Sequence, residues 1–197
     1  MPDAASQPPF RPLAQKLPDI ECIRKADGTV YLTQRHKPGD RPRSIPHALA
    51  TRAGIHPDRD WLKQRNPETD DWEAITYGEG LRRTRALAQA FLDMGAGPDA
   101  PVMILSGNSI ESALVMVAAM TIGAPAAPIS VPYSLMSTDF AKLKHCFGAV
   151  QPKVLFASQL KPFEPAIGAL GDHGCTVVTA DGANGAVSYH GLLDTAV

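Results

Sequence analysis

The residue types with the best spacing for chemistry lie in the stretch Ile104–Glu111, where a Ser-Gly-Asn-Ser turn separates a short apolar run from a long one. A turn of this kind can cradle a phosphate or present a nucleophilic serine. However, the sequence contains no GxxxxGK[S/T] loop, no GxGxxG and no GxSxG. We therefore interpret the stretch as a helix start in which Asn108 is the cap and Glu111 completes a capping-box arrangement.

Other groups that could do chemistry are scattered. The six histidines show neither i,i+4 pairing nor HExxH, and Cys22, Cys146 and Cys175 show no CxxC spacing. Arginines at 82, 83 and 85 suit either a phosphate site or, as we prefer, a solvated helix face. We therefore predict no catalytic residue, no ATP-binding residue and no metal site from motifs alone, and reduced thiols rather than disulfides.

Composition excludes several classes of protein. The chain has 197 residues and a formal net charge of −1, so no basic field favours nucleic acid as a partner. The apolar run Ala113–Met120 is far shorter than the ~20 residues that a membrane span needs, and the N-terminus lacks the pattern of a secretory signal. These features predict a cytoplasmic protein that does not enter a membrane.

The predicted elements that position these residues are β-hairpins in the first part of the chain and alternating strands and helices in the rest. Strand patterns flank Asp27-Gly28 and the Asn66–Asp71 turn, so two β-hairpins are predicted, with a short helix from Ser44 between them. Thr76 followed by Glu79 predicts a capping box and a helix that Gly95 ends. Strands and helices then alternate. The expected strands are 102–105, 126–130, 154–157 and 176–179, and the expected helices are 109–122, 139–150 and 163–170.

This alternation predicts the fold class: an α/β protein with a parallel sheet, helices on both faces and right-handed crossovers, preceded by N-terminal β-hairpins. We divide the chain into an extended arm (1–19), hairpins with a short helix (20–76), an α/β subdomain (77–180) and a loop followed by the start of a further segment (181–197). The helix through Ala113–Met120 is apolar nearly all round, so it is expected to be covered on most sides.

An ordered series of short motifs over residues 61–157 resembles the N-terminal subdomain of adenylate-forming acyl-CoA synthetases. The matching residues are Ile75-Thr76-Tyr77-Gly78-Glu79, Leu87-Ala88, Leu92, Met94-Gly95, Asp99, Val102, Gly107-Asn108-Ser109, Met120, Gly123-Ala124, Pro128-Ile129 and Lys153–Ala157. Three flanking stretches resemble the feruloyl-CoA synthetase branch: Pro9–Leu13, Asp27–Leu32, and Tyr133–Ser137 leading to Lys142–His145.

The resemblance implies a parent enzyme that joins an aromatic carboxylic acid to coenzyme A through an acyl-adenylate, with ATP and Mg²⁺. The family's Ser/Thr/Gly-rich phosphate loop, its ribose-binding Asp and its C-terminal domain have no match in this sequence. We therefore expect a fragment that ends before the phosphate loop, is inactive alone and binds none of these cofactors tightly. The resemblance offers Lys142 and Lys144 as weak CoA-binding candidates, with a solvated helix face as the alternative.

A non-catalytic binding or scaffolding module that keeps the subdomain fold is the alternative function. Such a module would associate with itself or a partner through exposed apolar surface, flanked by the helix Ala113–Met120 and the strand Val154–Ala157.

Overall fold

The computed structural model describes residues 18–66, 68–180, 182 and 185–197. They belong to two compact units, Met1–Arg41 and Pro42–Val197, which we treat separately. Most of the predicted N-terminal arm, and residues 181, 183 and 184 of the predicted C-terminal loop, lie outside the described residues. The division into four segments stays a prediction. Among the described residues, no helix combines the length and apolar character that a membrane span requires.

The first unit contains the predicted hairpin, β1 (Ile20–Arg24) paired with β2 (Val30–Gln34). Its turn uses Gly28 at a φ of +86°, and Asp27 Oδ1 accepts a hydrogen bond from Thr29 N at 2.9 Å. That bond lowers the pKa of Asp27. Several apolar side chains of the hairpin are exposed, including Leu32 at 69%.

The second unit begins with α1 (Ile45–Ile55), whose cap is Ser44 as predicted. Next comes the second predicted hairpin, β3 (Asp60–Arg65) and β4 (Trp72–Thr76), which pair in antiparallel register with a bulge after Asp60. The ring of Trp61 stacks on that of Tyr77 with centroids 6.1 Å apart, so the hairpin packs on the start of the next helix.

Helix α2 (Tyr77–Asp93) begins and ends where the sequence predicts. Thr76 Oγ1 accepts from Glu79 N at 3.2 Å, and Gly95 follows the helix at a φ of +84°. The reciprocal half of the capping box is not seen, because the Glu79 carboxylate instead binds Arg82 and Arg83. Leu92, near the end of the helix, is 47% exposed.

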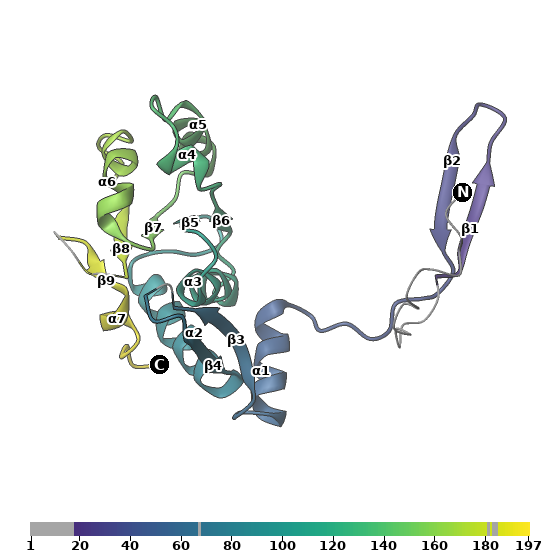
Figure 1. Ribbon diagram of the computed structural model, residues 1–197, viewed down its shortest axis with the longest axis horizontal. Coiled ribbons are helices and arrows are strands. Elements are labelled where there is room, and N and C mark those ends of the chain that lie inside the picture. The colour runs from purple at the N-terminus through teal and green to yellow at the C-terminus, as the bar shows by residue number, and fades with distance from the viewer. Residues whose placement is uncertain (1–17, 67, 181, 183–184) are drawn as a thin grey trace. The chain divides into compact units, whose positions relative to one another are not determined.

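A parallel five-stranded sheet forms the centre of the second unit, in the order β6-β5-β7-β8-β9 (Figure 1). Its strands are β5 (Val102–Leu105), β6 (Ala126–Pro128), β7 (Val154–Ala157), β8 (Thr176–Thr179) and β9 (Val187–Ser188). The remaining helices are α3 (Ile110–Thr121), α4 (Pro132–Leu135), α5 (Ala141–Val150), α6 (Leu160–Gly168) and α7 (Tyr189–Leu192). The predicted fold class is confirmed.

Helices cover both faces of the sheet, as Figure 1 shows. Alternate residues of a strand point to opposite faces, so Ile104 and Phe156 join α2, α3 and α7 in one core while Leu105 and Leu155 join α5 and α6 in the other. Strands buried on both faces are continuous apolar runs, which is typical of a parallel sheet.

Helix α3 is largely covered by neighbouring elements rather than lying at an exposed surface. Leu114, Val115, Ala118 and Ala119 are fully buried, and α1, α2 and β3 pack against the helix. The strand β7 is also buried throughout. The chain itself therefore covers most of both elements, and the exposed apolar patch beside them stays a prediction.

Three departures from the predicted elements have local causes. Helix α6 begins at Leu160, three residues earlier than expected, and continues through Pro165. Proline is tolerated in the first helical turn, so Pro162 does not delay the start. The helix α4 and the strand β9 were not predicted, because four and two residues are too short for a detectable period.

Candidate functional site

Polar side chains that could bind a ligand lie at the carboxyl ends of the parallel strands. Two hollows lie there in the second unit, one after β6 and one after β5, β7 and β8. Ligands of open α/β sheets bind at this edge, since loops and helix N-termini converge on it. We therefore build the candidate site from these two hollows.

The cleft after β6 is formed by α4 and the start of α5. It has a volume of about 320 Å³, and its lining includes Tyr133, Ser137, Asp139 and Lys142. Lys142 Nζ lies 5.3 Å from the centroid of the Tyr133 ring, a cation–π distance. This arrangement offers a cation and an aromatic face to the same small volume.

A short hydrogen-bond network joins Ser137, Asp139 and Ala141 beside this cleft. Asp139 Oδ1 accepts from Ala141 N at 3.0 Å and from Ser137 Oγ at 3.1 Å. These two bonds, with the positive charge of Lys144, lower the pKa of Asp139. The carboxylate thereby acts in place of a side-chain cap for α5, whose cap residue Phe140 makes no such bond.

The structure separates the two lysines that the sequence offered as CoA-binding candidates. Lys142 lines the cleft, whereas Lys144 is exposed and does not line it. Residues two apart on a helix point in different directions, which explains the separation. Tyr133 is the cleft residue that sequence reasoning did not single out, although it lies in the Tyr133–Ser137 stretch that carried the family resemblance.

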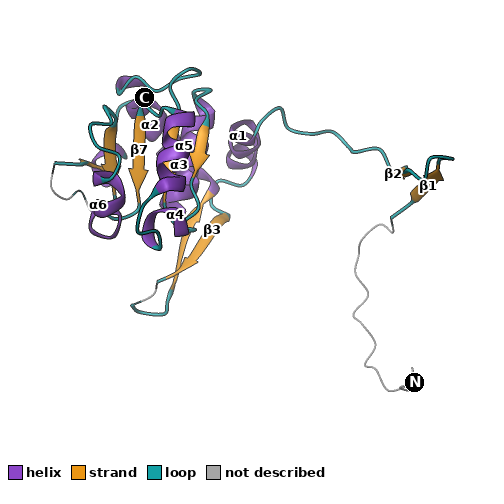
Figure 2. Cartoon of the chain, turned by 90° about the horizontal axis from the view of Figure 1, so that it is seen from above, coloured by secondary structure: helices purple, strands orange, loops and turns teal. Residues whose placement is uncertain are grey.

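The second hollow is a crevice of about 510 Å³ after β5, β7 and β8. Its lining comes from the β3 strand, the loops after β5, β7 and β8, and the first turn of α3: Gln64, Arg65, Asn108, Ser109, Glu111, Ser158, Gln159 and Ala180. Figure 2 shows the β3 hairpin extending past the carboxyl end of β7. Gln64 and Arg65, at the end of β3, line the crevice at this edge. We call this hollow the carboxyl-edge crevice.

The helix cap at this crevice is not the predicted residue. Ser109 is the N-cap of α3, and its Oγ accepts from Ser112 N at 3.1 Å. Asn108 lies one position before this cap, and it lines the crevice. Either residue type caps helices well, so residue preference alone did not decide between them.

A long-range hydrogen bond ties the hairpin to this helix start. Gln64 Oε1 accepts from Ile110 N at 2.8 Å, across 46 residues, while Gln64 Nε2 donates to Glu73 at 3.2 Å. The first free amide of α3 is therefore satisfied by β3. No local sequence signal reveals such a bond, because its partners are distant in the chain.

The arginine cluster that suits phosphate is used structurally. Arg82 and Arg83 both donate to the Glu79 carboxylate, at 2.8 and 2.6 Å. Hydrogen bonds from Arg82 and then Arg83 lower the pKa of Glu79 to about 2. Arg82 also donates to Leu193 O at 3.0 Å and so holds the C-terminal segment against α2.

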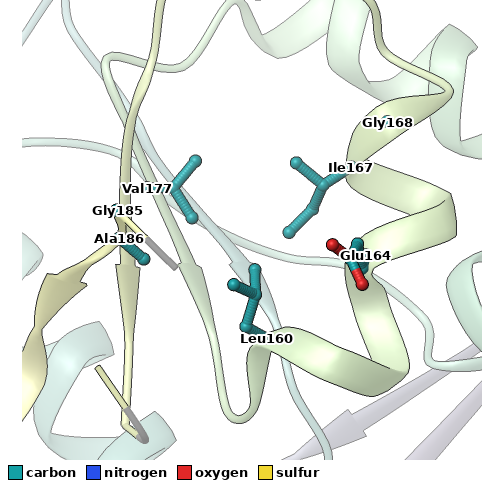
Figure 3. A pocket seen from close by; sticks show the side chains of 7 residues that line it. All are labelled: Leu160, Glu164, Ile167, Gly168, Val177, Gly185 and Ala186. Carbon is teal, nitrogen blue, oxygen red and sulfur yellow. The ribbon is translucent and has the colours of Figure 1, made fainter. Parts of the chain in front are cut away.

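An apolar groove of about 310 Å³ separates α6 from β8. Figure 3 shows Val177 and Ile167 facing each other across it, with Leu160 at one end. Among the described residues that line it, Glu164 alone is charged, so they offer little to a chemical step. Throughout the described residues, no group of three or more His, Cys, Asp or Glu side chains is placed to hold a metal ion, and the three cysteines are free.

The sequence of the second unit matches a known protein family. A model of AMP-binding enzymes matches residues 49–191, which is more than half of the chain. The chain belongs to the AMP-binding enzyme family. No curated protein sequence matches it significantly.

Solved structures share this fold at low identity. The N-terminal domain of FACL13 from Mycobacterium tuberculosis is 23% identical with a TM-score of 0.60, covering 79% of this chain and 37% of that chain. A benzoate CoA ligase from Burkholderia xenovorans LB400 is 16% identical with a TM-score of 0.60, covering 77% and 28%. A fatty acyl-adenylate ligase from L. pneumophila, in complex with acyl adenylate and pyrophosphate, is 17% identical with a TM-score of 0.57, covering 72% and 24%. This AMP-binding chain therefore spans less than two fifths of the length of each of these three.

Proposed function

We propose that the chain is the N-terminal part of an ATP-dependent ligase that joins a feruloyl-type aromatic acid to coenzyme A. The family match over residues 49–191 is the observation that carries the proposal. A benzoate CoA ligase and an adenylate-bound ligase among the structural neighbours are in keeping with it. The feruloyl-like stretches Asp27–Leu32 and Tyr133–Ser137 favour an aromatic acid over a fatty acid.

The proposed reaction has two balanced steps. An oxygen of the carboxylate attacks the α-phosphorus of ATP, and pyrophosphate leaves. The thiol of coenzyme A then attacks the acyl carbonyl and loses its proton, and AMP leaves. AMP is a far better leaving group than the oxygen of a free carboxylate, which is why adenylation comes first.

We assign no residue of this chain to ATP or Mg²⁺. The sequence has no Gly-rich phosphate loop, and the described residues hold no cluster that fits a metal ion. We propose that residues 1–197 alone neither bind ATP tightly nor turn over, and that the protein works in the cytoplasm, where its three free thiols stay reduced.

The contribution that we assign to this chain is binding of the coenzyme A phosphates. The cleft places the Lys142 ammonium beside the Tyr133 ring, and these two groups can hold a phosphate and an adenine ring. Lys144 contributes positive charge from outside the cleft lining. Both lysines remain proposals.

The activity test uses the protein produced from its native gene, with ferulate, ATP and coenzyme A, and AMP formation as the readout. We expect AMP that depends on ferulate, and none from residues 1–197 alone. Decanoate serves as the control acid. AMP formation with decanoate but not ferulate would overturn the aromatic assignment, and turnover by residues 1–197 would overturn the proposed inactivity.

The cleft is tested separately by Lys142→Ala in the active protein. Loss of a phosphate contact should raise KM for coenzyme A about fivefold while KM for ATP and ferulate stay unchanged. Lys161→Ala on α6 is the matched control, because Lys161 is also exposed but lies outside the cleft. An unchanged KM for coenzyme A would remove Lys142 from the site.

The scaffolding alternative has one observation in its favour. Trp72 and Met136 are exposed at 64% and 79%, although they lie on different elements. Analytical ultracentrifugation separates the two functions: a concentration-dependent dimer that the double variant Trp72→Ser, Met136→Ser abolishes would favour the module, and a monomer at all concentrations would exclude self-association.

A further inference from the structure

The carboxyl-edge crevice lies at the topological switch point of the sheet. The chain leaves β5 for β6 on one side and returns to β7 on the other side of β5. The following helices α3 and α6 pack on opposite faces, so the loops after β5 and β7 diverge. A crevice between two such loops is where open α/β sheets bind ligands.

The crevice is not built for an anion, although α3 begins there. Ile110 N is bound by Gln64 Oε1, Ser112 N by Ser109 Oγ and Ala113 N by Ser109 O. The helix dipole is already opposed by the Glu111 carboxylate in the first turn. Arg65 donates to Asp70 rather than into the crevice. A phosphate there would meet bound amides and a like charge.

Four other lining side chains keep their hydrogen-bonding capacity. Within the described part of the chain, those of Asn108, Glu111, Ser158 and Gln159 make no hydrogen bond or ion pair. Glu111 is half-buried, so its unpaired carboxylate faces less water than a surface group. Two amides, a hydroxyl and a carboxylate therefore line one volume, and they come from the loop after β5, the first turn of α3 and the loop after β7.

We propose that the carboxyl-edge crevice binds a neutral small molecule with neighbouring hydroxyls, of the ribofuranoside class, through the Glu111 carboxylate. A carboxylate only accepts hydrogen bonds, and its two oxygens match two adjacent hydroxyls. Asn108 and Gln159 both donate and accept, as hydroxyl groups require of their partners. The crevice, at about 510 Å³, has room for a ligand of this class.

The test is a titration of the complete 197-residue chain, followed by NMR of its backbone amides. The probes are methyl β-D-ribofuranoside, its 2-deoxy analogue and inorganic phosphate. We expect saturable shifts at residues 64–65, 108–111 and 158–159, with a Kd of about 1–10 mM for the ribofuranoside. The 2-deoxy analogue should bind about tenfold more weakly, because it lacks one of the paired hydroxyls. Phosphate should not bind there.

Glu111→Gln keeps the shape of the side chain and should weaken the ribofuranoside about tenfold. Glu164→Gln on α6 is the matched control and should leave binding unchanged. Any one of four results would overturn the inference: equal affinity for both sugars, unchanged affinity in the Glu111→Gln variant, phosphate binding at the crevice, or the absence of saturable shifts. None of these outcomes bears on the ligase, which rests on the family match and is tested by AMP formation.

Discussion

At the scale of single residues, the start of α3 shows how little separates a cap from a ligand-facing side chain. Ser109 and Asn108 are neighbours that both suit a cap and both line the crevice, yet only the Ser109 hydroxyl binds the helix amide. Ser109→Ala should therefore lower the free energy of unfolding by about 1 kcal/mol. Asn108→Ala should change it by less than about 0.5 kcal/mol. Urea denaturation measures both, and equal losses would restore Asn108 as the cap.

The carboxyl of Glu79 predicts how stability depends on pH. Its pKa is about 2 in the folded chain, below the ordinary 4.5. A lowered pKa stabilises the fold above about pH 4.5, and this contribution is lost as the pH falls toward 2. The side chain is 34% exposed, so solvent screening limits the effect to about 1 kcal/mol.

Glu79→Gln should therefore destabilise the chain by about 1 kcal/mol at neutral pH and progressively less below pH 4.5. Urea denaturation over a series of pH values compares the variant with the wild type. Glu164→Gln, whose carboxylate makes no ion pair among the described residues, is the control. A constant difference across the series would exclude titration of Glu79 as the cause.

At the scale of elements, Gly80 decides how the β3–β4 hairpin packs on α2. A Cβ at this position would lie 2.5 Å from Cε3 of Trp61, so the ring must move. Gly80→Ala should cost about 1–3 kcal/mol by overpacking, although alanine favours helices. Gly148→Ala in α5 meets nothing within 4 Å and should instead stabilise by about 0.5–1 kcal/mol. Thermal unfolding followed by tryptophan fluorescence checks both signs.

The C-terminal segment offers a second prediction at this scale. Arg82 Nη1 donates to Leu193 O, and Tyr189 packs against Phe156 with centroids 5.8 Å apart. Arg82→Ala should raise amide hydrogen exchange over residues 189–195 about fivefold, the equivalent of about 1 kcal/mol. Arg85→Ala, on the same helix and without a hydrogen bond in the described chain, should leave exchange there unchanged. Equal exchange in both variants would show that the Arg82 bond adds nothing.

At the scale of the whole molecule, the two compact units differ in what they can bury. The β1–β2 hairpin has two strands and exposed apolar side chains, and such a hairpin is marginal alone. Residues 42–197 hold both cores of the sheet. We therefore expect residues 42–197 to unfold cooperatively as a separate protein, with the near-ultraviolet circular dichroism of a packed core. A non-cooperative transition would contradict this expectation.

The sequence by itself determined the fold class and most element positions. Strands such as Val102–Leu105 and Val154–Ala157 are apolar runs bounded by helix patterns, and caps such as Ser44 and Thr76 are set by neighbouring residues. These signals are local, and local backbone preferences act within a few residues. The short elements α4 and β9 escaped because they hold too few residues for a period.

Only the tertiary structure decided what the polar residues do. Gln64 caps a helix 46 residues away, Arg82 binds the Leu193 carbonyl 111 residues away, and Lys142 rather than Lys144 reaches the cleft. The carboxyl-edge crevice joins residues from four separate segments. Such sites depend on the order of strands in the sheet and on the direction in which each helix leaves it, and neither is a local property of the chain.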